Sequence, residues 1–427
     1  MKERLAIIEG VRTPFCKAGG PLAGLSADDL GAIAVRELIA RTAFPPAQLD
    51  ELIAGNVAQP IEAANVARVI ALKAGLPTTL IASSVHRNCA SGMEAVTTAA
   101  NRIAAGEAQA IMTVGCESMS NIPLMFSRPM TALFARLMRA KSLWQRLAVW
   151  SSFRPGMLAP VVGVQVGLTD PVCGLNMGQT AELLAREFAV TRLDQDQWAL
   201  TSHQRALAAQ ARLAEEIVPL PLPPAYDKVQ AVDDGPRPGQ DLAALAKLKP
   251  YFDKLAGTVT VGNACPLTDG AAALLVMSEA RARELQLSPL GYLREYAYAA
   301  LDGRRMGLGP VFATARLLAK SGLTLADFEL IELNEAFAAQ SIACERAFAS
   351  AAFARAELGR ESALGTIDRE RLNVNGGAIA LGHPVGATGA RLILTLLKEL
   401  RRRKLQRGLA TLCVGGGQGA ALALEVA

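Results

Sequence analysis

Short apolar runs alternate with small-residue helical stretches along most of this 427-residue chain. Residues 110–114 (Ala-Ile-Met-Thr-Val) predict a buried strand, and the Ala-rich spacing of residues 89–106 predicts a helix before it. The same order returns near the C-terminus, where a helix predicted over 382–403 precedes an apolar strand over 409–414. Strands that alternate with helices predict an α/β fold with sheets covered by helices.

Two further pairs of segments match between the halves of the chain. Residues 269–276 resemble residues 418–424 in their run of small and apolar side chains. Residues 52–56 and 330–334 are both short apolar strands that run into an asparagine. These matches predict a duplicated architecture, although spacing alone leaves coincidence open.

The segment between the two copies matches neither of them. It contains proline clusters at 219–224 and 236–238, which are typical of irregular loops, and helix candidates over 177–188 and 194–213. We expect it to lie over the functional site. The predicted division is an N-terminal half (1–117 with 251–285), an inserted loop domain (118–250) and a C-terminal half (286–427).

Within the insertion, residues 128–153 combine helical apolar spacing with basic side chains. The apolar positions include Leu133, Leu137, Trp144 and Trp150, and no Asp or Glu lies between positions 117 and 170. This pattern is typical of a helix that lies on a membrane surface or docks on a partner protein. An ordinary amphipathic helix packed on its own protein fits the pattern equally well.

Composition narrows the class of protein. Apolar residues make up 51% of the chain and charged residues 19%, with a net charge of +5, as expected for a compact protein with two or three domains. The seven cysteines are scattered without a C-x-x-C pair, which argues against structural zinc and favours reduced thiols in the cytoplasm. No apolar run reaches the ~18 residues of a spanning helix. The basic residues lack a nucleic-acid-binding module, so no nucleic acid is expected.

Cys89 and His383 are the leading candidates for chemistry. Cys89 stands at a predicted helix start, where the helix dipole and free N–H groups favour a thiolate. The alternative is a buried small residue. His383 lies in a glycine-rich stretch (375–389) before Pro384, a residue suited to the first turn of a helix. Its alternative is a capped helix in a glycine-rich loop.

Two strand ends add candidate partners. Cys413 ends the last apolar strand but one and runs into Gly415, Gly416 and Gly417, whose backbone N–H groups suit an oxyanion hole. A thiol packed at a strand end is the alternative for Cys413. Asn334 also follows an apolar strand, where it could position a water or a carbonyl oxygen, or cap a helix.

These residues belong to blocks that resemble the signature blocks of the thiolase family. The blocks are N-C-A-S-G at 88–92, G-N-A-C-P-L-T-D-G at 262–270, N-E-A-F-A at 334–338, G-G-A-I-A-L-G-H-P-V-G-A-T-G at 376–389 and C-V-G-G-G-Q-G at 413–419. They occur in the family's order and span nearly the whole chain. The resemblance implies the thiolase fold, with two duplicated βαβαβαββ halves in a five-layered αβαβα arrangement and an inserted loop domain.

The resemblance also implies an acyltransferase acting on 3-ketoacyl-CoA, with CoA and acetyl-CoA as substrates and no cofactor or metal. Cys89 would carry the acyl group, with His383 as its base, and Cys413 would exchange a proton with the acetyl-CoA carbanion. Asn334, through a water, and His383 would stabilise one oxyanion. The backbone N–H groups of Cys89 and Gly415 would stabilise the other.

For CoA, the resemblance points to Arg237 near the nucleotide and to a pantetheine channel lined by Met177, Gly262, Cys265, Ala336 and Phe337. Cys265 stands where the family usually has serine, and Asn176 stands where many members have histidine. Met306 is expected to line the pocket that selects the length of the acyl chain.

The resemblance further implies a homodimer or homotetramer. The basic insertion resembles that of thiolase subunits in fatty-acid β-oxidation complexes, where such a segment contacts the membrane or the partner subunit, so a peripheral membrane location is open. Acyl-chain length and direction of flux stay open too. Two other readings remain: a ketoacyl synthase-like condensing enzyme, and a non-catalytic CoA- or lipid-binding relative or scaffold subunit.

Overall fold

A ten-stranded mixed sheet forms the centre of the protein, which a computed structural model describes over residues 4–426. Five strands of the N-terminal half lie side by side in this sheet. The first three in spatial order alternate in direction, and the last two run parallel to the third. Their spatial order is β1 (Leu5–Arg12), β10 (Thr268–Ser278), β5 (Ala110–Ser118), β3 (Glu51–Gly55) and β4 (Ile81–Val85), with the short β2 (Cys16–Lys17) beside β10.

The C-terminal half repeats this order with one strand fewer. Its strands are β11 (Gly291–Ala300), β14 (Gln418–Glu425), β13 (Arg407–Val414) and β12 (Leu330–Leu333), with the last pair parallel. Where a counterpart of β4 is expected, Leu372 makes only an isolated parallel bridge to Ile331. The predicted repeat is confirmed, because β3, β5 and β10 correspond in place and sequence to β12, β13 and β14.

Two helices fill the space between the halves of the sheet. They are α3 (Ser91–Ala104) and α16 (Val385–Arg403), which contribute Met93 and Leu392 to one buried core together with Ile111 and Leu412 from the strands on either side. Within residues 4–426, β1 and β11 join the two halves of the sheet by pairing Leu5 to Ile7 with Leu293 to Gly291.

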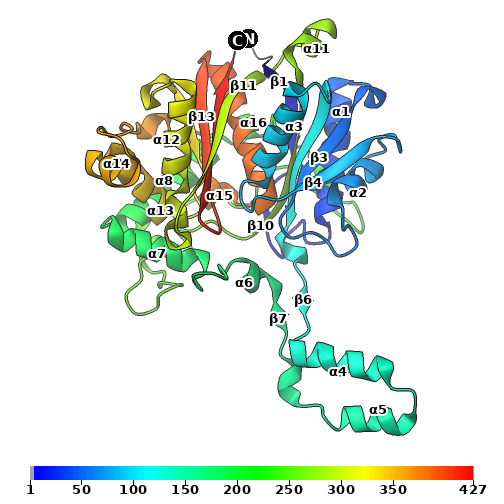
Figure 1. The fold of residues 1–427 in the computed structure, drawn as a ribbon. Helices are drawn as coiled ribbons and strands as arrows, with labels where there is room; N and C mark the ends of the chain where they lie inside the picture. The colour runs from blue at the N-terminus through cyan, green and yellow to red at the C-terminus, as the bar shows by residue number, and fades with distance from the viewer. Residues whose placement is uncertain (1–3, 427) are drawn as a thin grey trace.

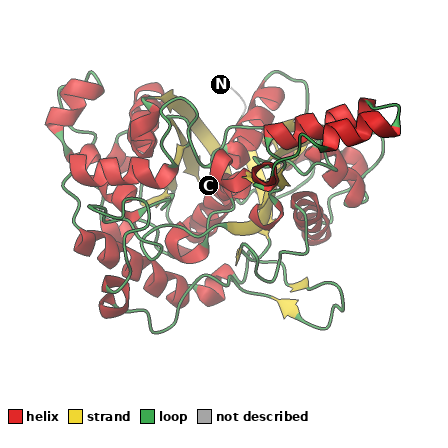
Figure 2. Cartoon of the chain, turned by 90° about the horizontal axis from the view of Figure 1, so that it is seen from below, coloured by secondary structure: helices red, strands yellow, loops and turns green. Residues whose placement is uncertain are grey.

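Further helices cover the outer faces of the sheet. α1 (Ala27–Thr42) and α2 (Val66–Lys73) cover the N-terminal half, and α12 (Gly309–Ser321) and α13 (Ala338–Ala349) cover the C-terminal half. Helices thus lie outside both sets of strands as well as between them (Figures 1 and 2). The predicted α/β class and five-layered order are confirmed.

The sequence of α16 explains its central place. Leu392, Leu396 and Leu400 recur at helical spacing and are fully buried between the sheets, while the last turn carries three arginines that suit the negative end of the helix dipole. The crossing with α3 is close, since a Cβ on Gly92 would lie 2.7 Å from the backbone N of Ala390. The starts of these two helices, which follow Cys89 and His383 in sequence, are thereby brought together.

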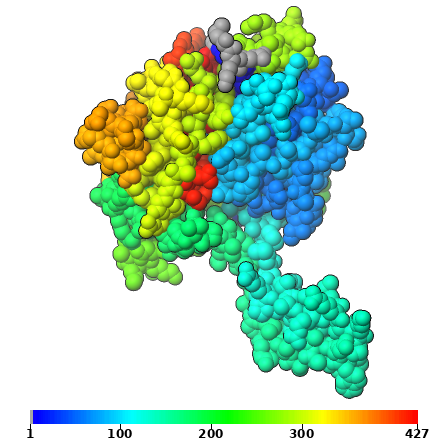
Figure 3. Space-filling view, in the orientation of Figure 1, coloured from blue at the N-terminus to red at the C-terminus, as the bar shows by residue number. Residues whose placement is uncertain are grey.

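Residues 118–250 divide into two structurally different parts. A helical hairpin of α4 (Arg128–Arg139) and α5 (Leu143–Trp150) stands away from the body on a stalk formed by β6 (Leu124–Met125) and β7 (Val161–Val162) (Figures 1 and 3). The remainder lies on the body, where α7 (Met177–Glu187) and α8 (Arg192–Ala208) join the core of the C-terminal half. The boundaries 118–250 themselves stay a prediction.

Shorter elements complete the fold. They are α6 (Gly163–Gly167), α9 (Gln210–Leu213), α10 (Leu242–Ala246), α11 (Glu279–Glu284), α14 (Ala351–Glu357), α15 (Ala378–Leu381), β8 (Leu220–Pro221), β9 (Val229–Gln230) and the 3-10 helices Pro46–Gln48, Met119–Asn121, Pro155–Leu158, Gly303–Leu308, Leu325–Asp327 and Arg369–Arg371. Across residues 4–426, no helix combines the length and the apolar character needed to cross a bilayer.

Candidate active site

The loops that carry Cys89 and Gly415 meet directly. The side chain of Asn88 donates a hydrogen bond from Nδ2 to the backbone oxygen of Gly415 at 2.7 Å. The backbone amide of Gly415 in turn favours the thiolate form of Cys89 and so acts to lower the pKa of that thiol. Asn88 adopts φ 43°, in the left-handed region that asparagine tolerates better than most residues. The predicted neighbours Cys89 and Gly415 are therefore in contact.

Cys89 itself is a partly buried residue one position before the N-cap of α3. Burial raises the pKa of its thiol, the nearby Glu117 carboxylate adds to the rise, and backbone amides of Gly415 and Cys89 oppose it. The expectation that the helix start makes Cys89 a thiolate is wrong for the free protein, because desolvation outweighs these donors.

His383 is buried and held in one orientation. Its ring Nδ1 lies 2.6 Å from the hydroxyl oxygen of Thr388, and that hydroxyl donates to the backbone oxygen of Pro384 at 3.0 Å. Because the Thr388 hydrogen is used in this way, its oxygen accepts from His383, which assigns the proton to Nδ1 and leaves Nε2 as an unprotonated acceptor that faces the Asn334 amide. Burial lowers the pKa of His383 to about 3, with the Arg391 charge adding to the effect, so the imidazole is neutral at physiological pH.

Asn334 follows β12 and faces the free nitrogen of His383. Its Nδ2 lies 3.5 Å from Nε2 of His383, and its Oδ1 is buried without a hydrogen-bond partner among residues 4–426. The helix that follows starts at Ala338, with Phe337 as its N-cap, so the alternative of Asn334 as a helix cap is excluded. An amide with unused capacity beside the imidazole suits a water or a substrate oxygen.

Cys413 lies at the end of β13 and is almost fully buried. Burial raises the pKa of this thiol well above its ordinary value, and the neighbouring cysteines Cys89, Cys344 and Cys265 add to the rise. A thiol that holds its proton at neutral pH suits the donation of that proton to a strongly basic carbon.

The segments proposed to line the pantetheine channel lie side by side. The backbone N of Cys265 donates to the oxygen of Ala336 at 3.0 Å, and Ala264 forms an isolated antiparallel bridge with Phe337. Gly262 lies under Leu248, whose side chain a Cβ on this glycine would overlap. Burial raises the pKa of Cys265 to about 12, so this thiol is neutral as the usual serine would be.

Met177 lies at the edge of the Cys89 site, at the first position of α7. A Cβ on Gly415 would stand 3.4 Å from its sulfur. Asn176, where many relatives have histidine, is the N-cap of α7 and accepts from the backbone N of Gln179 at 2.9 Å. Met306 is buried in the core of the C-terminal half, and its part in chain-length selection stays a prediction.

Arg237 follows a tight loop beside the glycine-rich segment of His383. Its backbone N donates to Nδ1 of His203 at 3.3 Å, and Gly235 is packed against the backbone oxygen of Ala380, where no Cβ would fit. Burial lowers the pKa of His203 to about 4, helped by Arg237 and Lys17, which keeps the ring neutral and able to accept. His203 is buried.

Sequence reasoning missed the residues that hold these groups in place. Thr388 orients His383, and Thr268 accepts at its hydroxyl from the backbone N of His383 at 3.1 Å. Glu335 is a buried carboxylate that accepts from Trp198, Ser202, Asn373 and the backbone N of Ile379. All three residues lie inside the signature blocks, which was the one sign in the sequence that they matter. Their partners could not be predicted, because most of them come from segments remote in sequence.

Two comparisons with known proteins assign the chain to a protein family. The thiolase N-terminal domain family matches residues 5–280, and the thiolase C-terminal domain family matches residues 287–426. The chain belongs to the thiolase family. This thiolase is 44% identical over 429 residues to a 3-ketoacyl-CoA thiolase of Aeromonas salmonicida, covering 99% of this chain and 97% of the relative. A 3-ketoacyl-CoA thiolase of Yersinia enterocolitica is 44% identical over 427 residues, with the same coverage.

Solved structures agree with this assignment. The Bacillus anthracis acetyl-CoA acetyltransferase superposes on the thiolase with a TM-score of 0.86 at 36% identity, covering 99% of each chain. Human mitochondrial 3-ketoacyl-CoA thiolase in complex with CoA gives a TM-score of 0.85 at 33% identity, covering 100% of this chain and 98% of that one. The roles of individual site residues stay predictions.

Proposed function

We propose that this thiolase is an acyltransferase that cleaves 3-ketoacyl-CoA with CoA to acetyl-CoA and a shortened acyl-CoA, or runs the reverse Claisen condensation. The observation that carries the proposal is the meeting of the Cys89 and Gly415 loops, together with the neutral imidazole of His383 before the start of α16, the helix that crosses α3 closely. That combination supplies a nucleophile, a base and an oxyanion donor.

In the cleavage direction, Cys89 sulfur attacks the keto carbon while its proton passes to Nε2 of His383. The resulting alkoxide collapses, the bond between C2 and C3 breaks, and the electron pair moves to C2 of the departing acetyl-CoA. The Cys413 thiol protonates that carbon, which leaves an acyl-Cys89 thioester and a Cys413 thiolate. The raised pKa of Cys413 makes this proton available at neutral pH.

Free CoA completes the cycle. Its thiol gives a proton to the Cys413 thiolate and its sulfur attacks the acyl-Cys89 carbonyl. The second tetrahedral intermediate expels Cys89 sulfur, which recovers its proton from His383. Neither the Cys89 thiol nor the imidazole is charged at rest, so charge appears only when substrate oxygen can share it.

Two sets of donors stabilise the oxyanions. Protonated Nε2 of His383, with Asn334 acting through a water, serves one of them. The backbone amides of Cys89 and Gly415 serve the thioester oxygen of the other. The backbone amide of Gly415 already acts on the Cys89 thiol in the free protein, so this donor lies near the reacting sulfur before substrate binds.

Acetoacetyl-CoA and CoA provide the test. The wild-type protein is expected to decrease the absorbance of the ketoacyl thioester, and Cys89→Ala is expected to abolish this decrease. Cys173→Ala changes another partly exposed cysteine outside the site and is expected to leave the decrease unchanged. A folded wild-type protein without turnover on any chain length from four to about sixteen carbons would reject the proposal. The same series of catalytic efficiencies decides chain-length preference.

The two rival functions predict other outcomes. A ketoacyl synthase-like enzyme would use carrier-protein thioesters in preference to CoA, and Cys413 with its glycine-rich turn argues against it because that site normally uses a second histidine or an asparagine. A non-catalytic CoA- or lipid-binding relative or scaffold subunit would bind acyl-CoA without labelling Cys89. Mass spectrometry of the protein after brief exposure to acetoacetyl-CoA separates these cases by an acetyl group on Cys89.

The helical hairpin is proposed to dock on an anionic membrane surface. Its own small core uses Met130, Leu133 and Val149, so the alternative of self-packing accounts for only part of its apolar side chains. Trp144 is 80% exposed and Met138 87% exposed. Its basic residues are Arg128, Arg136, Arg139, Lys141, Arg146 and Arg154, and across residues 4–426 none of them forms an ion pair. Exposed tryptophan beside unpaired cations matches the interface of an anionic bilayer.

Vesicles of phosphatidylglycerol and phosphatidylcholine test this docking. Co-sedimentation with anionic vesicles is expected to fall as salt rises, and to be lost on deletion of 128–153 or in the pair Arg139→Glu and Lys141→Glu. Lys247→Glu with Lys249→Glu changes two exposed lysines on the body and serves as the matched control. The assignment would be overturned if the deletion variant bound vesicles as well as the wild type. It would also be overturned if the wild-type protein bound a β-oxidation partner subunit but no vesicles. A homodimer or homotetramer is expected in light scattering.

A further inference from the structure

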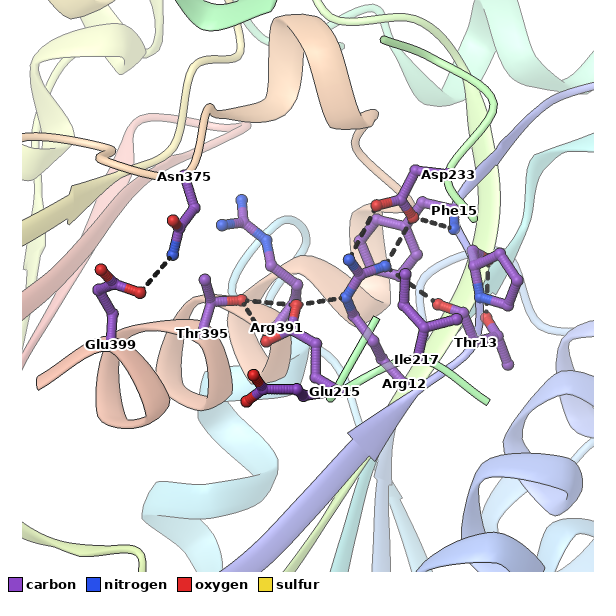
Figure 4. Close-up of polar contacts among 12 residues, drawn as sticks. Arg12, Thr13, Phe15, Glu215, Ile217, Asp233, Asn375, Arg391, Thr395 and Glu399 are labelled. Carbon is purple, nitrogen blue, oxygen red and sulfur yellow. Dashed lines mark hydrogen bonds and ion pairs between the residues drawn. The ribbon is translucent and has the colours of Figure 1, made fainter. Parts of the chain in front are cut away.

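A buried ion network lies behind the segment that carries Arg237 (Figure 4). Arg12, at the end of β1, is fully buried and donates from Nη1 and Nη2 to the two carboxylate oxygens of Asp233 at 2.6 and 2.8 Å. Its Nε donates to Glu216 at 2.6 Å. A bidentate pair of this kind fixes both the distance and the orientation of its partners.

Asp233 and Asp234 attach their segment to the chain after β1. The backbone N of Phe15 donates to Asp233 at 2.7 Å, and the backbone N of Lys17 donates to Asp234 at 2.9 Å. The backbone N of Asp234 donates back to the oxygen of Phe15 at 3.2 Å. The segment is therefore clamped from both its side chains and its backbone.

Few other contacts hold this segment. Within the described chain, the remaining hydrogen bond between 233–237 and more distant residues is the one from the backbone N of Arg237 to His203. Gly235 adds close packing against Ala380 in the segment before His383. The clamp made by Arg12, Phe15 and Lys17 therefore supplies most of the hydrogen bonds that attach residues 233–237 to distant parts of the described chain.

The other partner of Arg12 leads to a different element. Glu216 accepts from the hydroxyl of Thr395 in α16 at 3.0 and 3.1 Å, so it joins β1 to the central helix. Among residues 4–426, no hydrogen bond or ion pair joins Glu216 to residues 233–237. Arg12 therefore has one carboxylate partner that serves the segment and another that serves the core, which gives a matched pair of substitutions.

We propose that Arg12 and Asp233 are positioning residues that set the place of Arg237 and thereby the affinity for the nucleotide part of CoA. The inference rests on the proposed function and on the expectation, from the family resemblance, that Arg237 lies near the CoA nucleotide. It assigns to the buried pair a role in recognising nucleotide-bearing thiols and thioesters, separate from the chemistry at Cys89. Both carboxylate oxygens of Asp233 are used, so an amide at this position loses one Arg12 bond and faces that donor with another donor.

The test compares acyl acceptors with and without the nucleotide. With Asp233→Asn, the KM for CoA is expected to rise about tenfold, the effect of one lost charged hydrogen bond on binding, while kcat at saturating CoA stays within about twofold. N-acetylcysteamine and its acetoacetyl thioester lack the nucleotide. With these two substrates, Asp233→Asn is expected to show the same rate of cleavage as the wild type. Asp233→Glu restores a carboxylate and is expected to recover part of the CoA affinity.

Glu216→Gln is the control, since it weakens the same arginine without touching the segment. It is expected to lower the unfolding temperature and to leave the KM for CoA unchanged. Equal losses with CoA and N-acetylcysteamine in folded Asp233→Asn, or the same rise in KM for Glu216→Gln, would overturn the inference. If Asp233→Asn does not fold, Asp234→Ala removes the acceptor of the Lys17 backbone N and is measured in the same way. Failure of the proposed function is distinct, because wild-type protein would then cleave neither thioester.

Discussion

Thr388 decides which nitrogen of His383 is free, and its replacement by valine is the most direct test of the site's geometry. The two side chains are close in volume, but valine offers no oxygen to the Nδ1–H group 2.6 Å away. The imidazole then keeps an unsatisfied buried donor, or moves its proton to Nε2 and loses the acceptor that Cys89 needs.

The size of the effect follows from the burial of this pair. Both His383 and Thr388 are buried, so water cannot replace the lost oxygen. Leaving a buried donor unsatisfied costs about 1–3 kcal/mol, which corresponds to roughly a 5- to 160-fold loss in rate. The loss should fall on the acylation step, because the tautomer matters when Cys89 gives up its proton.

Rapid mixing with acetoacetyl-CoA measures this step as the rate of acyl-Cys89 formation. Thr388→Ser keeps the hydroxyl and is the matched control, with a rate expected within about threefold of the wild type because a serine still accepts from Nδ1. Thermal unfolding of both variants checks that the fold is retained. Equal acylation rates for the valine and serine variants would refute the assignment of Nε2 as the proton acceptor.

Three further predictions concern packing, pH and reactivity. Gly92→Ala should lower the free energy of unfolding by about 1–3 kcal/mol in urea titrations, because its Cβ would overlap α16, whereas Gly156→Ala, with open space around it, should have little effect. Burial raises the pKa of Glu117 to about 7, so the folded state binds a proton that the unfolded state releases, and stability should fall as pH rises from about 4.5 to 7. Glu117→Gln should remove this dependence of the urea midpoint on pH in that window. An unchanged slope of the midpoint against pH would contradict the assignment. The rate of iodoacetamide labelling at Cys89 should still rise above pH 9, where a small reference thiol has levelled off, since its pKa is raised; a plateau near pH 7 would show a preformed thiolate.

The sequence predicted the repeat well because its signal is local. The apolar runs before Asn56 and Asn334 form β3 and β12, and the helix predicted over 382–403 is observed over Val385–Arg403. Buried strands and an amphipathic helix are specified by the order of apolar residues within a few turns. The missing counterpart of β4 could not be predicted, since the bridge at Leu372 depends on how its neighbours pack.

The state of Cys89 shows where local reasoning failed. A helix start is visible in sequence, and the helix dipole favours a thiolate, but burial of the thiol raises its pKa instead. Desolvation depends on everything that surrounds the sulfur, including Gly415 from the other half. The same holds for His203, which stands in a polar stretch of the sequence and which the fold buries against the Arg237 segment.

By itself the sequence determined the α/β class, the duplicated halves and the blocks that carry Cys89, His383, Cys413 and Asn334, because periodicity and motif order are properties of short stretches. Only the tertiary structure decided which atoms of those residues meet, which imidazole nitrogen is free and which thiols hold their protons. It also decided that Arg12 holds the segment before Arg237, across more than 200 residues of chain. Burial and hydrogen bonding between remote segments set these properties, and no local pattern encodes them.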